Sequence, residues 1–360
     1  MTKNIPTGAG VRSSAQRTAY LFSVLCLSIF GHTLIGCSDQ NQSEAAQFFL
    51  KGNLKLEQKE YANAIRYYEE ALAKKSDFAD VHSNRGIAYL QLGELDKAIE
   101  DFNKAIEIDR KFEQAYFNRA GALIDKKDFP AAAADLEQIR TAYGDSSNYY
   151  LKWGDLKSHQ GYYDQALAEY DRSLILRPEN VQALVNRGVV YFSKRNFVAA
   201  QRDFEKALKL DPQHPLAYNN LALIFARNNQ PDQALKFIDR ALDFDAVNPI
   251  YLNNKGYILL LRNQPEEAKK LIDQSLNKAP QNSYALRNLG LYFLGNDRKV
   301  EALDAFQKAY QLDPSTDQIH DWLGEALLLN NQKQKACKTW QQGQSLGDEA
   351  CGRKLKQHCK

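Results

Sequence analysis

The chain has 360 residues, which is enough for two or three ordinary domains. With 44% hydrophobic and 25% charged residues and only 10 prolines, its composition is that of a globular protein and excludes a collagenous or largely disordered chain. The formal net charge of +3 comes from residues 1–36, which contain three basic residues and no acidic one. The rest of the chain is neutral overall, which excludes a general basic surface for nucleic acid.

Residues 1–36 have the pattern of an export signal. Lys3, Arg12 and Arg17 form a positive region, and the apolar run 20–30 follows it. This run is shorter than the roughly 20 apolar residues of a membrane-spanning helix. It ends in small residues, as a cleavable signal does. The sequence therefore predicts that residues 1–36 are removed.

The sequence Leu-Ile-Gly-Cys at residues 34–37 resembles the lipobox of bacterial lipoproteins. The resemblance implies that Cys37 carries lipid, that the chain is cut before it, and that the lipid anchors the protein to a membrane. Ser38 after the cysteine favours the outer membrane, facing the periplasm, with exposure on the cell surface left open. Residues 37–44 are expected to form a lipidated cysteine and a polar tether. The alternative is an uncleaved anchor, or an ordinary signal with an unrelated cysteine.

A period of 34 residues runs through residues 45–350 without insertion or deletion. Each of the nine repeats has a small residue at its eighth position, alanine at its twentieth and a large side chain at its twenty-fourth. Small residues on facing helices let the helix axes approach, and the large side chain fills the space beside them. The alanines are Ala64, Ala98, Ala132, Ala166, Ala200, Ala234, Ala268, Ala302 and Ala336.

This pattern closely resembles the tetratricopeptide repeat. It is clearest in NRGIAYLQLGELDKAIEDFNKAIEID from Asn84 and in NRGVVYFSKRNFVAAQRDFEKALKLDP from Asn186. The resemblance implies an all-α fold, a right-handed superhelical solenoid of nine tandem helix-turn-helix repeats with a concave groove. The third repeat departs from the pattern, with Ile139 where alanine is usual, which leaves room for a local change of superhelical pitch.

The segment after Gly347 predicts a final amphipathic helix that ends with residues 351–360. A repeat array needs such a capping helix because its last apolar face would otherwise meet water. The basic run of this segment suits a helix C-terminus, and a basic docking patch is the alternative.

Three cysteines remain after Cys37, and an exported protein can keep disulfides. Cys351 and Cys359 lie eight residues apart on one predicted helix, about 12 Å, which is too far for a bond. Pairing of Cys337 with either of them stays open. The pattern AC…W…LG…C resembles the ends of other bacterial repeat proteins, and this resemblance favours Cys337–Cys359. Free thiols or a metal site are alternatives, although the spacing matches no C-x-x-C motif.

The first helix of each repeat is expected to line the groove, and asparagine dominates its sixth position. An amide both donates and accepts hydrogen bonds, so a row of asparagines can pair with the backbone of an extended peptide. Alternatively, the asparagines fix the helix pairs. Repeats six to eight, with a further polar position, are the preferred ligand region. The candidate partner-binding residues are Asn84, Asn118, Lys152, Asn186, Asn219, Asn220, Asn253, Asn254, Arg287 and Asn288.

No catalytic motif stands out. The G-x-S-x-G match at residues 343–347 falls at the end of a predicted helix, where a nucleophile elbow would need a preceding strand. The columns that hold chaperone tails in related repeats do not match either. We expect no enzyme activity, cofactor or metal. The sequence predicts a membrane-anchored scaffold or adaptor of the bacterial cell envelope that binds proteins or extended peptides in its groove. The alternative is an assembly factor that oligomerises through its repeat ends or convex surface.

Overall fold

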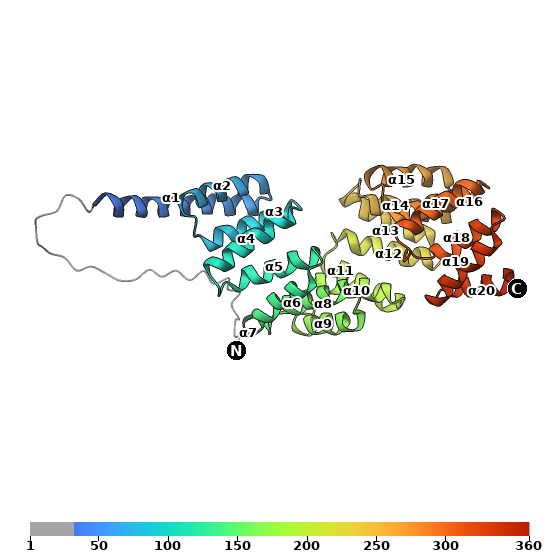
Figure 1. Cartoon of the computed structure of the whole chain (residues 1–360), viewed down its shortest axis with the longest axis horizontal. Helices are drawn as coiled ribbons and strands as arrows, with labels where there is room; N and C mark the ends of the chain where they lie inside the picture. Colours follow the sequence, from blue (N-terminus) through green and yellow to red (C-terminus); the bar gives the residue numbers. More distant parts are fainter. Residues whose placement is uncertain (1–31, 360) are drawn as a thin grey trace, which may run out of the picture.

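The computed structural model describes residues 32–359, and this part of the chain is all helical, with twenty helices and no strand. The helices stack in chain order along the long axis of the molecule (Figure 1). The predicted all-α solenoid is confirmed. Most of the predicted export signal lies outside the described residues, and so does the side chain of Cys37.

Consecutive helices pack as hairpins, joined by short turns. In the described range these hairpins are α1 (His32–Glu57) with α2 (Tyr61–Lys74), α3 (Ala79–Gln91) with α4 (Leu95–Ile108), α5 (Glu113–Asp125) with α6 (Phe129–Gln138), α8 (Ser147–His159) with α9 (Tyr163–Leu176), α10 (Val181–Ser193) with α11 (Phe197–Leu210), α12 (Pro215–Arg227) with α13 (Pro231–Phe244), α14 (Pro249–Leu261) with α15 (Pro265–Lys278), α16 (Ser283–Gly295) with α17 (Lys299–Leu312), and α18 (Ile319–Leu329) with α19 (Lys333–Ser345). We expected residues 38–44 to form a polar tether, but they lie within α1. No proline or glycine interrupts the helix between these positions.

The turn inside every hairpin has the same backbone conformation. In each hairpin the residue two positions after the end of the first helix has a positive φ, between 56° and 79°. These residues recur every 34 positions. This left-handed conformation ends a helix and is tolerated best by glycine and asparagine. The residues are Lys59, Gly93, Lys127, Gly161, Arg195, Asn229, Asn263, Asp297 and Asn331. The backbone therefore repeats with the period that the side chains predict.

The small and large columns meet in the core. A Cβ atom at Gly86 would lie 2.8 Å from Cε1 of Phe102, and one at Gly188 would lie 2.7 Å from Cε1 of Phe204. The ring therefore fills the place of the missing side chain, and this contact brings the two helices of a hairpin together. The large residues are all buried: Tyr68, Phe102, Leu136, Tyr170, Phe204, Ile238, Ile272, Phe306 and Trp340.

The third repeat departs from the others, as Ile139 indicates. Helix α6 has 10 residues where the second helices of the other hairpins have 13 or 14. It stops at Gln138, and the four-residue helix α7 (Arg140–Tyr143) follows. Ile139 is buried at the break, where the other repeats have a smaller residue. The bulky Ile139 side chain thus fills the space in which a smaller residue would let the two helices touch.

The ninth repeat departs in a way that the sequence did not predict. Helix α18 has 11 residues, whereas the first helices from α3 to α16 have 13, and it begins two positions late. Residues 314–318 form turns instead, and Gln318 has φ of 60°. This unwound segment lies at the groove.

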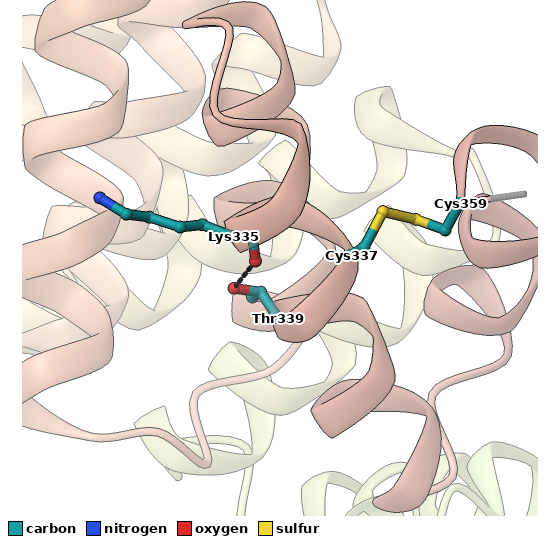
Figure 2. The surroundings of a disulfide bond; sticks show 4 residues. All are labelled: Lys335, Cys337, Thr339 and Cys359. Carbon is teal, nitrogen blue, oxygen red and sulfur yellow. Dashed lines mark hydrogen bonds between the residues drawn. A yellow bond between two sulfur atoms is a disulfide. The ribbon is translucent and has the colours of Figure 1, made fainter.

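The predicted capping helix is α20 (Glu349–His358). A disulfide joins Cys337 on α19 to Cys359 after α20, with Cα atoms 5.8 Å apart (Figure 2). It is one of the two pairings left open by the sequence, and it holds the cap against the last repeat. Cys351 is a buried thiol, and burial raises its pKa to about 12. No helix between residues 32 and 359 combines the length and apolar character needed to cross a bilayer.

Candidate partner-binding groove

In the first repeats, the asparagines of the sixth position bond to the preceding repeat. The amide of Asn84 donates to Oδ1 of Asn53 at 2.8 Å. The amide of Asn186 donates to Oδ1 of Asp155 at 2.7 Å, and the hydroxyl of Tyr170 donates to the same oxygen at 2.9 Å. Burial raises the pKa of Asp155. These amides therefore join neighbouring hairpins.

In the third and fourth repeats, the sixth-position side chains Asn118 and Lys152 make fewer polar contacts than the asparagines described above. Gln114 donates to Oδ1 of Asn118 at 3.0 Å, but the buried Nδ2 of Asn118 has no acceptor among the described residues. The ammonium group of Lys152 lies 5.8 Å from the centroid of the Phe117 ring. The unpaired amide of Asn118 therefore lies one repeat before Lys152, which interrupts the row of asparagines.

In repeats six to eight the candidate residues form one chain of hydrogen bonds. Asn254 donates to Oδ1 of Asn219 at 2.8 Å, and Asn288 donates to Oδ1 of Asn253 at 2.8 Å. Arg287 extends the chain, because its Nη2 and Nε donate to Oδ1 of Asn288 at 2.7 and 3.1 Å. All five side chains are buried.

This arrangement favours the second interpretation of the asparagines, in which they fix the stacking of the hairpins. Asn220 also bonds within its own helix, since its amide donates to the carbonyl of Leu216 at 2.8 Å. Asn254 and Arg287 are the two members of the candidate set that also line the main groove cavity. Of the other lining residues, the aromatic and apolar ones were missed because these types also occur in the core, and charged ones such as Arg227 and Asp317 were missed because they come together from repeats far apart in sequence.

The cavity has a volume of about 580 Å³. It lies in the second half of the array, between the ends of α10 and α12 and the segment 314–318. Aromatic and aliphatic side chains share its wall with guanidinium groups. The residues that define its character are Phe192, Leu223, Tyr257, Tyr284, Arg227 and Arg287. A hollow that combines apolar surface with convergent polar groups is typical of a binding site.

One carboxylate bridges the cavity. Oδ2 of Asp317 lies 3.2 Å from Nη1 of Arg227, and Oδ1 lies 3.5 Å from Nη2 of Arg195. Asp317 and Arg227 are 90 residues apart in sequence. The late start of α18 frees Asp317 from the helix for these contacts, so the sixth repeat and the beginning of the ninth are linked across the groove.

A second hollow, of about 730 Å³, lies over α3 and α4 beside Arg85 and Asp101. Its central charges already pair, with Nη2 of Arg85 2.7 Å from Oδ1 of Asp101. Among the described residues no group of three or more histidine, cysteine or acidic side chains has the geometry of a metal site. Ser345 of the G-x-S-x-G match ends α19, and its hydroxyl donates to the carbonyl of Gln342 at 2.7 Å.

Fold and groove together define a helical-repeat solenoid of the kind that mediates protein–protein interactions. Sequence profiles described as tetratricopeptide repeat or TPR repeat match residues 52–93, 79–112, 151–200, 191–249 and 253–317. The chain belongs to the tetratricopeptide repeat family.

Curated relatives share only part of their length with this chain. It is 30% identical to the DnaJ homolog subfamily C member 7 homolog of Schizosaccharomyces pombe, over 46% of this chain and 39% of that protein. It is 27% identical to serine/threonine-protein phosphatase 5 of Mus musculus, over 38% of this chain and 28% of the phosphatase. The chain therefore spans less than two fifths of the length of these relatives.

Among solved structures, the chain resembles one in the crystal structure of the APC/C hetero-tetramer Cut9–Hcn1. The TM-score is 0.61 with 13% identity, over 88% of this chain and 76% of that one. Human IFIT1, in a dimer with m7Gppp-AAAA, gives a TM-score of 0.54 with 14% identity over 74% and 68% of the two chains. At these identities the likeness shows the fold alone.

Proposed function

We propose that this protein is a lipid-anchored scaffold of the bacterial cell envelope that holds partner proteins by extended segments in the groove of its second half. The observation that carries the proposal is the cavity of about 580 Å³, where aromatic rings and guanidinium groups from several repeats stand together. Aromatic and arginine side chains are the usual anchors of protein interfaces. The anchor rests on the resemblance of residues 34–37 to the lipobox.

Site-specific photo-crosslinking in the native envelope tests the groove. A photoreactive residue replaces Tyr284, which lines the cavity and is 43% exposed. The matched control replaces Ile175 on α9, which is 78% exposed and lies outside the cavity wall. We expect partner adducts from position 284 and none of the same mass from position 175. Adducts of the same partner from position 175 alone would contradict the proposal.

The lipid anchor has its own test. The variant Cys37→Ala lacks the thiol that would carry the lipid, so we expect it to leave the membrane fraction after cell lysis. A control with Cys351→Ala, which removes a buried thiol at the other end of the chain, should stay in the membrane fraction. Retention of the Cys37 variant in the membrane would contradict lipid anchoring.

Assembly through the ends of the array is the second candidate function. Leu50 and Leu54 are exposed and lie one turn apart on α1, which leaves an apolar strip on the first hairpin. A photoreactive residue at position 54 distinguishes the two functions. Adducts of this chain with a second copy would support assembly, whereas monomeric protein together with partner adducts from position 284 would support the scaffold.

A further inference from the structure

The cavity of the second half surrounds a guanidinium group that lacks an opposite charge. Arg287 is 6% exposed, and three of its five N–H donors have acceptors, namely Oδ1 of Asn288 twice and the carbonyl of Asp317 at 3.0 Å. Among the described residues no acidic side chain forms an ion pair with it. A buried charge without a partner is costly. Burial lowers the pKa of Arg287, and the nearby charge of Asp317 only partly opposes this shift.

The carboxylate that Arg287 lacks is close by but bound elsewhere. Asp317 places its carbonyl toward Arg287 and its carboxylate on Arg227 and Arg195. The cavity wall contains three guanidinium groups, those of Arg195, Arg227 and Arg287, and two carboxylates, those of Asp317 and Asp348. The carboxylate of Asp348 also caps α20, accepting from the amide of Ala350 at 2.9 Å. The wall as a whole favours an added anion.

The segment that carries Asp317 differs in backbone conformation from the same positions of the other repeats. It ends at Gln318, whose φ of 60° is unfavourable for a residue with a side chain. First helices from α3 to α16 start two positions earlier in their repeats than α18 does. Residues 317–318 stand at positions that are helical in those repeats, so an extension of α18 over them would relieve the left-handed residue.

We propose that the cavity anchors an acidic side chain of an extended partner segment, whose carboxylate displaces that of Asp317 from Arg227 and accepts from the unused donors of Arg287. This subsite rests on the proposed scaffold function and names the partner's chemistry. Tyr257 and Tyr284 form the walls, with the Arg287 guanidinium 5.1 and 5.5 Å from their ring centroids. They hold Arg287 in place and offer apolar surface to the neighbouring residues of the segment.

Fluorescence anisotropy with the full chain in detergent tests the subsite. The probes are two labelled peptides of one glycine-, serine- and tyrosine-rich sequence with amidated ends, one with central glutamates and the other with glutamines. We expect the glutamate peptide to bind about tenfold tighter, as for a charge-assisted hydrogen bond in a partly buried site. A peptide without acidic side chains but with a free C-terminus tests the other source of a carboxylate, and we expect it to bind like the glutamine peptide.

Variants assign the effect to the cavity. Arg227→Gln should abolish the preference for glutamate, while Arg172→Gln should keep it, because Arg172 is an exposed arginine on α9 paired with Glu169. Asp317→Asn removes the internal competitor and should tighten glutamate binding by about threefold, since the carboxylate no longer has to be displaced. Arg287 itself is left unchanged because it supports Asn288.

Equal affinity for the two peptides, binding of neither, or a preference that survives in Arg227→Gln would overturn the subsite. Tighter binding of the peptide with the free C-terminus would overturn its assignment to an acidic side chain. These failures differ from failure of the scaffold function: photo-adducts from position 284 persist if only the subsite is wrong, and disappear if the groove holds no partner.

Discussion

The two halves of the array bury their polar groups in different places. In the first half, α1–α11, arginines pair with aspartates inside single hairpins. Each arginine makes two hydrogen bonds of 2.6 to 2.8 Å to a buried carboxylate 16 residues later. The pairs are Arg85 with Asp101, Arg119 with Asp135, and Arg187 with Asp203.

In the second half, α12–α20, the corresponding positions are mostly apolar, as in Leu221 and Phe237. The buried polar side chains lie instead between hairpins, where they form the hydrogen bonds that run from the Asn219 side chain to that of Arg287. The first half therefore has buried charge pairs inside its hairpins in addition to amide bonds between them, whereas the buried polar contacts of the second half lie mainly between hairpins. The groove cavity of about 580 Å³ lies against the hairpins that these amide bonds hold together.

The largest effect should come from Asn288→Ala. Asn288 is 0% exposed, accepts two hydrogen bonds from Arg287 and donates one to Asn253, so the change leaves a buried charge without its acceptor. We expect a loss of about 4 kcal/mol. Urea denaturation of a Trp153→Phe background measures it, because the fluorescence then comes from Trp322 and Trp340 in the second half.

The matched control for this change is Asn118→Ala in the first half. Its buried amide nitrogen has no acceptor among the described residues, so the loss should stay below about 1 kcal/mol. If the two substitutions cost the same, the hydrogen bonds of Asn288 with Arg287 and Asn253 do not stabilise the second half.

Removal of the disulfide should have the next largest effect. The double variant Cys337→Ser with Cys359→Ser opens a link between residues 22 apart, for which chain entropy predicts a loss of about 3 kcal/mol. The loss should appear as early unfolding of α20, measured by proteolysis after Arg353 or Lys354. The variant Cys351→Ala keeps the disulfide and should resist the protease longer. Equal cleavage of both would show that packing alone holds the cap.

A smaller and more local effect is expected from Asp135→Ala. It leaves the half-buried Arg119 with Asn103 as its remaining side-chain partner, and we expect a loss of about 2 kcal/mol. Hydrogen exchange should show lost protection in α5 and α6 and unchanged protection in the second half. Asp125→Ala, at an exposed aspartate on α5, serves as the control. Loss of protection that spread into α12–α20 would contradict a local role of the Arg119–Asp135 pair.

The smallest effect concerns pH. Burial lowers the pKa of His214 and of His320, both in the second half. Their unfolded forms bind protons below about pH 6.5 while the folded forms stay neutral, so stability is present above that pH and falls as the pH drops below it. Between pH 7 and 5 we expect a loss of about 1 kcal/mol in the transition reported by Trp322 and Trp340. The double variant His214→Gln with His320→Gln should flatten this dependence, and an unchanged slope would assign it to other groups.

The sequence predicts the fold well because each repeat is a local unit. The columns of alanine, glycine and large residues fix how two neighbouring helices pack, and these contacts join residues about 16 apart, such as Gly188 and Phe204. The Arg–Asp pairs have the same separation, so their recurrence was also readable from the sequence. Ile139 shows that even a departure is visible where one bulky residue enters a small column.

The groove could not be predicted to the same degree. The sixth position lies at the border between groove and hairpin interface, and an asparagine there is suited to both. The contact of Asp317 with Arg227 depends on the accumulated curvature of several repeats, which no local pattern specifies. The late start of α18 has no proline or glycine at positions 315–318 to mark it.

The link between Asp317 and Arg227 also has a mechanical consequence. A helical solenoid behaves as a spring, because each repeat contacts mainly its neighbours and small rotations add along the array. Asp317 at the start of the ninth repeat links that repeat to Arg227 of the sixth and Arg195 of the fifth, while the repeats before these have no such long-range ion pair among the described residues. The partner carboxylate that we propose displaces Asp317 from Arg227, so binding would open this link and let the second half stretch together with the first. The array would therefore be stiffer before it binds a partner than after.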